Sequence, residues 1–289
     1  MYSREMMAEF NRTDRRLSEL ESMEHQSVRD PYVAHQMSIG FLQAIPGKKW
    51  IGGAVSNLNE VNGAVVSSMT YNSATQMLNT DATRGYPYLD FTGSSEYLSS
   101  NYSLANFWSY DTATDGTYLS TAMKGITVGS WFWLDTVTAN SGIFSAWNVT
   151  TGDAAWRMYV EDTASVNSNQ HSLVFDVSAT GSYTAGQQEG ADVEINTSEW
   201  VFGVCRWYPG TSLSVQLFQR GVETSGQNTT SIVSDLYDGD YGYIGNMVGG
   251  GSSNFVVDGR VGLNFFHGSH FTDEMVQRIY ETSRHIYGV

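Results

Sequence analysis

Acidic, serine and histidine side chains are the groups in this chain that could perform hydrolytic chemistry. Cleavage of a glycosidic bond needs two carboxylates that flank it, but Glu161, Asp162 and Glu194 lack a spacing that would pair them. Serine catalysis needs an adjacent base, and no G-x-S-x-G motif occurs. The segment from His267 to His270 could bring two imidazoles near a hydroxyl, although a turn before a final helix explains it better. We therefore expect a protein that is not an enzyme.

Three aspartates close in sequence form the one candidate metal site. Asp235, Asp238 and Asp240 surround Gly239, which permits a tight loop. Calcium prefers oxygen ligands of this kind, although the spacing is not that of an EF-hand. We expect calcium as the only cofactor, with an acidic, solvated turn as the alternative.

Aromatic residues are the candidates for ligand contact, because sugar rings stack on the faces of Trp and Tyr. Most of them must belong to the core: Trp131 and Trp133 alternate with Phe132, so both faces of that strand carry rings. Four aromatic residues lie nearer to turn signals and are the predicted sugar contacts: Trp147, Trp156, Tyr208 and Tyr241.

Composition and charge limit the partners of the chain. Its 289 residues are 41% hydrophobic, 13% aromatic and 16% charged, with 29 glycines, as is typical of strands and turns. A net charge of −15 would repel nucleic acid and anionic membranes. The single cysteine, Cys205, excludes an intramolecular disulfide and fits a buried position. No apolar stretch is long enough for a membrane span or a secretory signal, so we expect a soluble protein.

The beginning of the chain predicts an amphipathic helix. Met6, Phe10, Leu17 and Leu20, with Thr13 between them, recur at alternating spacings of four and three. A seam of about two heptads is too short to be stable alone. We expect this stripe to pack on its own domain, on copies of itself or on a larger assembly.

A second helix is predicted from Asp30, as N-cap, and Pro31, as first helical residue, up to Pro46-Gly47. Its apolar face would consist of Val33, Met37, Phe41 and Ile45. Composition changes after this point, so we predict a helical attachment or oligomerisation segment over residues 1–46 and a separate domain over residues 47–289.

The predicted domain alternates short apolar runs with clusters of Gly, Asn, Asp and Ser, which indicates antiparallel strands and turns. No helical pattern interrupts the strands before Thr272, which excludes βαβ units. Thr272 and the acidic residues after it predict a short capped helix over residues 272–280. The clear strands lie at Tyr88–Phe91, Thr127–Leu134, Trp156–Val160, Leu173–Val177, Trp200–Tyr208, Leu213–Gln219 and Val261–Phe266.

Segments in a fixed order over roughly residues 86 to 282 resemble laminin-G-like domains. They are Tyr88–Leu98, Ile126–Trp133, Trp200–Val204, Leu213–Gly221, Tyr243–Gly245, Asp258–Leu263, Phe271–Glu274 and Ile279-Tyr280. The resemblance implies an all-β, antiparallel two-sheet jelly-roll sandwich of the concanavalin A-like kind, preceded by short N-terminal α-helices. Trp200 is followed by Val-Phe where the family has two His, and residues 48–85 match nothing; we expect them to supply the first strands.

The same resemblance extends to function. Enzymes on this sandwich carry an E-x-D-x-x-E strand, which is missing here, and laminin-G-like domains often bind calcium at a loop end. The arrangement resembles bacteriophage virion proteins that display such a domain. We therefore expect a non-enzymatic virion surface or adhesion protein (capsid decoration, head fibre or tail component) with a glycan-binding domain. Its partners would be copies of itself, a virion structural protein and a cell-surface glycan. The alternative is a secreted glycan hydrolase.

Overall fold

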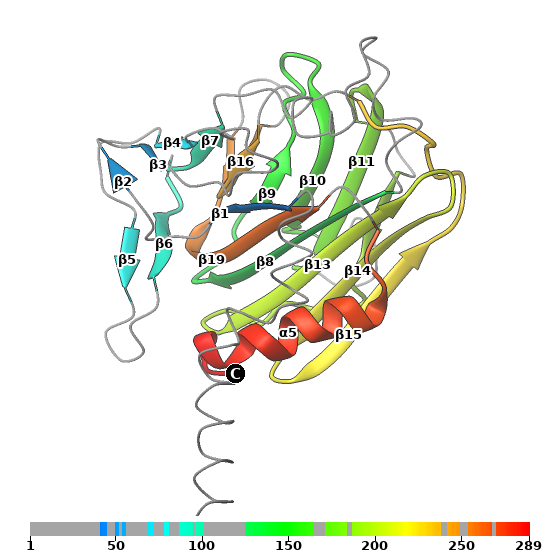
Figure 1. The fold of residues 1–289 in the computed structure, drawn as a ribbon. Helices are drawn as coiled ribbons and strands as arrows, with labels where there is room; N and C mark the ends of the chain where they lie inside the picture. The colour runs from blue at the N-terminus through cyan, green and yellow to red at the C-terminus, as the bar shows by residue number, and fades with distance from the viewer. Residues whose placement is uncertain are drawn as a thin grey trace, which may run out of the picture.

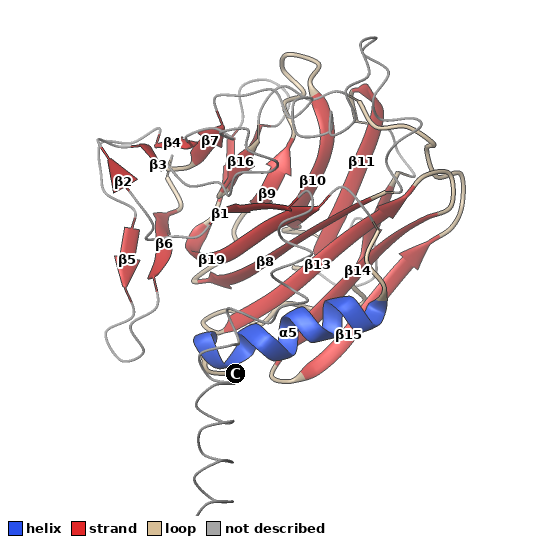
Figure 2. Cartoon of the chain, in the orientation of Figure 1, coloured by secondary structure: helices blue, strands red, loops and turns tan. Residues whose placement is uncertain are grey.

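The alternating apolar runs of the sequence pair as antiparallel strands in two sheets (Figures 1 and 2). The computed structural model describes residues 41–44, 50–51, 54–55, 69–71, 78–80, 87–94, 96–100, 125–163, 171–183, 187–237, 242–248, 254–267 and 270–289. The predicted antiparallel sandwich is confirmed over these residues. The N-terminal helix with Met6, Phe10, Leu17 and Leu20, and most of the second predicted helix, lie outside them.

The first sheet contains the longest of the described strands, which has ten residues. Its order is β15 (Val222–Asn228), β14 (Ser212–Gln219), β13 (Trp200–Tyr208), β8 (Ile126–Leu134), β19 (Asp258–His267), β6 (Pro87–Thr92) and β5 (Leu78–Thr80), and β1 (Phe41–Ala44) also pairs with β19. In register, Val204 of β13 lies opposite Gly129 of β8 and Gln216 of β14. Buried residues at nearly every position of β8, β13 and β14 show that both faces of this sheet are covered.

The second sheet lies across the core from the first. Its order is β12 (Gln188–Gly190), β11 (Leu173–Gly181), β10 (Ala154–Val160), β9 (Ser141–Ala146), β16 (Tyr243–Ile244), β7 (Leu98–Ser100), β4 (Met69–Tyr71), β3 (Ala54–Val55) and β2 (Trp50–Ile51). A separate hairpin consists of β17 (Asn246–Val248) and β18 (Asn254–Val256). As expected, strands between residues 50 and 80 join both sheets.

The main core fills the space between the two sheets. Phe132 from the first sheet and Trp156 and Phe175 from the second are fully buried members of it, and Cys205 lies in the same cluster. Burial raises the pKa of the Cys205 thiol well above its ordinary value. This cysteine is thus an inert core residue, as the sequence predicts.

A second apolar layer covers the outer face of the first sheet. The helix α5 (Asp273–Tyr287) lies along this face (Figure 1). Its Val276, Ile279 and Tyr280 pack on rings from four strands, β8, β13, β14 and β19. Those rings include Trp131, Phe202, Phe218 and Phe265. Because the helix supplies this cover, Trp131 is buried on the face opposite the main core.

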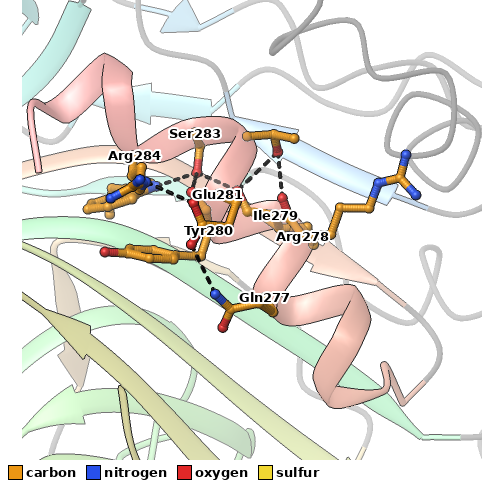
Figure 3. A network of polar contacts seen from close by, with 9 residues as sticks. Gln277, Arg278, Ile279, Tyr280, Glu281, Ser283 and Arg284 are labelled. Carbon is orange, nitrogen blue, oxygen red and sulfur yellow. Dashed lines mark hydrogen bonds and ion pairs between the residues drawn. The ribbon is translucent and has the colours of Figure 1, made fainter. Parts of the chain in front are cut away.

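The capping prediction for the final helix is confirmed. Thr272 is the N-cap, and its hydroxyl accepts a hydrogen bond from the backbone N–H of Met275. The helix ends at Tyr287, and Gly288 follows as the C-cap, in the left-handed conformation that closes the last turn. Figure 3 shows the polar contacts along its length, in which Ser283 donates to the Ile279 carbonyl at 2.6 Å. Ser283 also accepts a hydrogen bond from the indole N–H of Trp131 at 2.8 Å, which ties the helix to β8.

One element differs from its prediction. Phe41 belongs to the apolar stripe of the predicted second helix, but the backbone of Phe41–Ala44 is a strand that pairs with β19. A spacing of four residues fits a helix face, yet the open edge of β19 offers this segment a ladder of hydrogen bonds instead. The sheet therefore begins before residue 47, ahead of the predicted domain boundary.

Candidate functional site

A polar pocket opens where α5 stops covering the first sheet. Its volume is about 520 Å³. We call it the helix-start pocket, and its lining residues are Arg206, Ser214, Gln216, Glu223, Ser225, Gly226, Gln227, His270, Thr272, Asp273 and Glu274. The floor comes from β13, β14 and β15, and one wall comes from the first turn of α5 and the residues before it.

The period of two along each strand places these side chains on the outer face. On β13 that face carries Phe202, Val204 and Arg206 in succession, so it changes from apolar to polar along the strand. The apolar end lies under α5 and the polar end lies beyond the helix start. Register then aligns the polar residues: Arg206 lies opposite Ser214, which lies opposite Gln227.

Arg206 joins the wall of the pocket to its floor. Its Nη1 donates to the carbonyl of Phe271 at 2.8 Å, and its Nη2 forms an ion pair with Asp273 at 2.7 Å. The backbone N–H of Phe271 donates to the hydroxyl of Thr127 at 2.9 Å. These contacts fix the start of α5 against β13 and β8, so the wall is held by side chains as well as by the helix cap.

Several polar atoms in the floor have no hydrogen-bond partner within the described protein. They are Nε of Arg206, Oγ of Ser214 and Oε1 of Gln216, and all three side chains are more than nine-tenths buried. A buried polar atom without a partner costs about 1–3 kcal/mol. A hydroxyl-rich ligand that supplies the missing partners would recover part of that free energy.

An aromatic ring stands beside the pocket. Tyr208 is 45% exposed, and its ring centroid lies 5.5 Å from that of His270, a lining residue. Burial, and then the neighbouring Arg206, lower the pKa of His270. The imidazole is therefore neutral at pH 7, and Tyr208 offers a free face on which a sugar ring can stack.

The predicted sugar contacts are thus distributed over different environments. Tyr208 lies beside the pocket, whereas Trp147 and Trp156 are fully buried, and Tyr241 lies outside the described residues. Trp156 packs edge-on against Phe144 within the main core. A ring with no exposed surface offers no face to a sugar, so neither tryptophan can stack against a ligand in this conformation.

Trp147 is covered by a cation rather than by apolar core alone. The guanidinium of Arg157 lies over the ring of Trp147 and over the ring of Tyr159, 4.5 Å from each centroid. Nε of Arg157 donates to Asp176 at 2.6 Å. Burial raises the pKa of Asp176, and the charge of Arg157 opposes this rise. The outer face of β10 and β11 therefore carries a closed polar cluster with its own cation in place.

The predicted metal ligands are only partly described. Asp235 is exposed, and Asp238 and Asp240 lie outside the described residues. Within the described part of the chain, no three His, Cys, Asp or Glu side chains lie close enough together to hold a metal ion. The calcium site stays a prediction. In the same part of the chain, no helix is long and apolar enough to cross a membrane.

Sequence reasoning did not single out Arg206, Ser214 and Gln216. Their signal was present as polar residues at alternate positions of otherwise apolar strands. What the sequence lacks is the register between β13, β14 and β15, which alone brings these positions together. The site is therefore a product of strand pairing rather than of a contiguous motif.

Comparisons with known proteins agree on the fold. No protein-family model matches the chain, and no curated protein matches it. Among solved structures, the binding domain of Paraclostridial Mosquitocidal Protein 1 is 6% identical with a TM-score of 0.52. That alignment covers 88% of this chain and 55% of the other. A Trypanosoma rangeli sialidase, in complex with the inhibitor DANA, is 13% identical over 86% of this chain and 33% of its own, with a TM-score of 0.50.

A third structure is a CBM40 domain of a Ruminococcus gnavus sialidase, bound to α2,3 sialyllactose. It is 13% identical over 68% of this chain and 95% of its own, with a TM-score of 0.44. At these identities the first two comparisons support the β-sandwich fold and nothing finer. The resemblance to laminin-G-like domains stays a prediction.

Proposed function

We propose that this protein is a carbohydrate-binding domain whose ligand enters the helix-start pocket and stacks against Tyr208. A protein-bound sugar typically meets an aromatic face on one side and a set of hydrogen-bonding groups on the other. The pocket combines these two features at one place on the outer face of the first sheet. The sandwich fold, which a toxin binding domain shares, is compatible with this role.

The unpartnered polar atoms of the pocket floor are the observation that carries the proposal. Arg206 contributes a donor, Gln216 an acceptor and Ser214 a group that serves as either. Sugar hydroxyls both donate and accept, so they match this mixed set. A purely apolar ligand would leave all of these atoms unsatisfied.

A glycan array followed by titration calorimetry tests the proposal. We expect Tyr208→Ala to weaken binding of the best glycan by roughly two- to tenfold, because ring stacking contributes about 0.5–1.5 kcal/mol. The matched control is Tyr183→Ala, which removes a tyrosine of similar exposure, 48%, that is not at the pocket. The control should bind like the original protein.

A second variant fills the pocket from its rim. Ser225 is exposed on β15 and lines the pocket, so Ser225→Tyr should block the ligand without disturbing the core. Val222→Tyr, at an exposed position on the same strand outside the pocket, is its control. If no glycan binds, or if binding survives both Tyr208→Ala and Ser225→Tyr, the proposal is wrong.

The wider setting that we propose is a non-enzymatic display or adhesion protein, such as a component of a virion surface. Its support is in the sequence: no E-x-D-x-x-E strand occurs, and the apolar stripe of the N-terminal segment suits attachment to copies of itself or to a larger assembly. A secreted glycan hydrolase is the alternative. Incubating the protein with the glycans that bind and measuring new reducing ends separates the two, because turnover would contradict the display proposal.

A further inference from the structure

The charges around the helix-start pocket are unbalanced. Three carboxylates line it, on Glu223, Asp273 and Glu274, against the single guanidinium of Arg206. Because His270 is neutral, one positive and three negative charges give the lining residues a net charge of −2. The carboxylate of Glu274 stays ionised at neutral pH, because the hydroxyl of Thr272 stabilises its charged form and lowers its pKa.

Arg206, the one cation among the lining residues of the pocket, is already bound by groups of the protein. Proteins recognise a carboxylate best with the two-pronged fork of an arginine. In Arg206, Nη1 is held by the carbonyl of Phe271 and Nη2 by Asp273, which leaves only the buried Nε without a partner. An acidic sugar would thus meet like charges at the rim and no open fork in the floor.

The other polar groups of the pocket favour hydroxyl and amino groups instead. Glu223 accepts a hydrogen bond from Nε2 of Gln216 at 2.7 Å, which leaves its other oxygen available as an acceptor. Ser225 and Gln227 are exposed along the same strand. Carboxylates accept strong hydrogen bonds from hydroxyls and attract ammonium groups.

We propose that the helix-start pocket selects saccharides that carry no acidic group, amino sugars included, and rejects sialylated, uronic and sulfated ones. This inference rests on the proposed carbohydrate binding and assigns the ligand class of that pocket. The net charge of −15 acts in the same direction over longer distances, so the selection weakens as salt screens it.

The test uses a glycan array with sialylated and desialylated versions of each glycan, together with uronic and glucosamine oligomers. At low salt we expect the acid-free member of each pair to bind at least about fivefold more tightly, because the exposed carboxylates of the pocket repel the acidic member. The double variant Glu223→Gln/Glu274→Gln should narrow this preference. The control Glu281→Gln, on the same helix but outside the pocket, should leave the preference for acid-free glycans unchanged.

The possible outcomes separate this inference from the proposed function. Preferential binding of sialylated, uronic or sulfated glycans would overturn the inference and leave carbohydrate binding intact. A preference unchanged in the double variant would also overturn it, because the pocket charges would then not be its cause. Binding of no glycan at all would overturn the proposed function and the inference together.

Discussion

Arg206 shows how one residue can decide what a surface does. It lies among apolar neighbours on β13 and is 5% exposed. Two of its nitrogens, Nη1 and Nη2, bind groups at the start of α5. A buried cation persists only when it is paired and hydrogen-bonded. Its structural pairing is what keeps it from acting as an open anion site.

Titration of His270 is expected to change the stability of the folded protein just below neutral pH. Burial and the charge of Arg206 lower its pKa in the folded protein, and the charge of Asp273 opposes them. In the unfolded chain a histidine titrates near 6.5. Below that pH the unfolded chain binds more protons than the folded one, so stability falls as pH decreases through 6.5 toward the folded pKa.

We therefore expect His270→Gln to lose part of this pH dependence. The measurement is the melting temperature of both proteins at pH 7.5 and pH 5.5. The variant should show the smaller decrease, while His285→Gln, an exposed histidine of α5, should behave like the original protein. Equal decreases in all three proteins would show that His270 is not responsible.

At the scale of elements, α5 determines how the outer face of the first sheet is divided. Its apolar side covers one end of β13 and β14, and its first turn walls the pocket at the other end. The sequence was sufficient to predict the start of this helix, because Thr272, Asp273 and Glu274 form a local start signal. The helix continues to Tyr287, however, whereas the predicted one ended at residue 280. The sequence did not indicate the face on which the helix lies, since that depends on contacts between distant strands.

The helix contact on the sheet is tested by two substitutions at one position. The ring centroid of Tyr280 lies 4.4 Å from the ring centroid of Phe218 and 5.8 Å from that of Trp131. Tyr280→Ala should lower the free energy of unfolding by about 3–5 kcal/mol, as other large-to-small core substitutions do. Urea denaturation measures the change.

Tyr280→Phe is the matched control for that experiment. The hydroxyl of Tyr280 is buried without a hydrogen-bond partner in the described part of the chain. Removing the hydroxyl should leave the free energy of unfolding unchanged or raise it by up to about 1 kcal/mol, because folding then no longer buries an unpaired polar group. A large loss of stability in Tyr280→Phe would show that the hydroxyl has an important partner.

For the whole molecule, the sequence predicted the sandwich fold correctly but not the residue at which the sandwich begins. The short apolar runs that form β8, β13 and β14, and the turn residues between them, were enough to indicate antiparallel sheets. The strand at Phe41–Ala44 was assigned to a helix, because four apolar residues at spacings of four fit that period. Pairing with β19, more than half the chain away in sequence, overrides such a local pattern.

The contribution of β1 leads to a prediction about truncation. A chain beginning at residue 40 keeps the pairing of β1 with Asn264–His267 of β19, whereas one beginning at residue 47 exposes that edge. We expect both to fold, with the shorter chain melting at a lower temperature and associating more readily, since a free strand edge invites other strands.

Circular dichroism melting and light scattering of the two truncated chains provide the measurement. The full chain is the reference for both. If the chain beginning at residue 47 is as stable and as monodisperse as the one beginning at residue 40, the β1–β19 pairing contributes nothing and the boundary belongs at residue 47.

The connections around the pocket have a consequence for the order of folding. Short turns join β13 to β14 and β14 to β15, so the pocket floor is a meander that is contiguous from Trp200 to Asn228. Contacts between neighbours in sequence close small loops and form at low entropic cost. The wall at residues 270–274 belongs to a distant segment, so we expect it to dock afterwards. The chain can thus assemble a complete floor that is not yet competent to enclose a ligand, and docking of α5 is the step that creates the site.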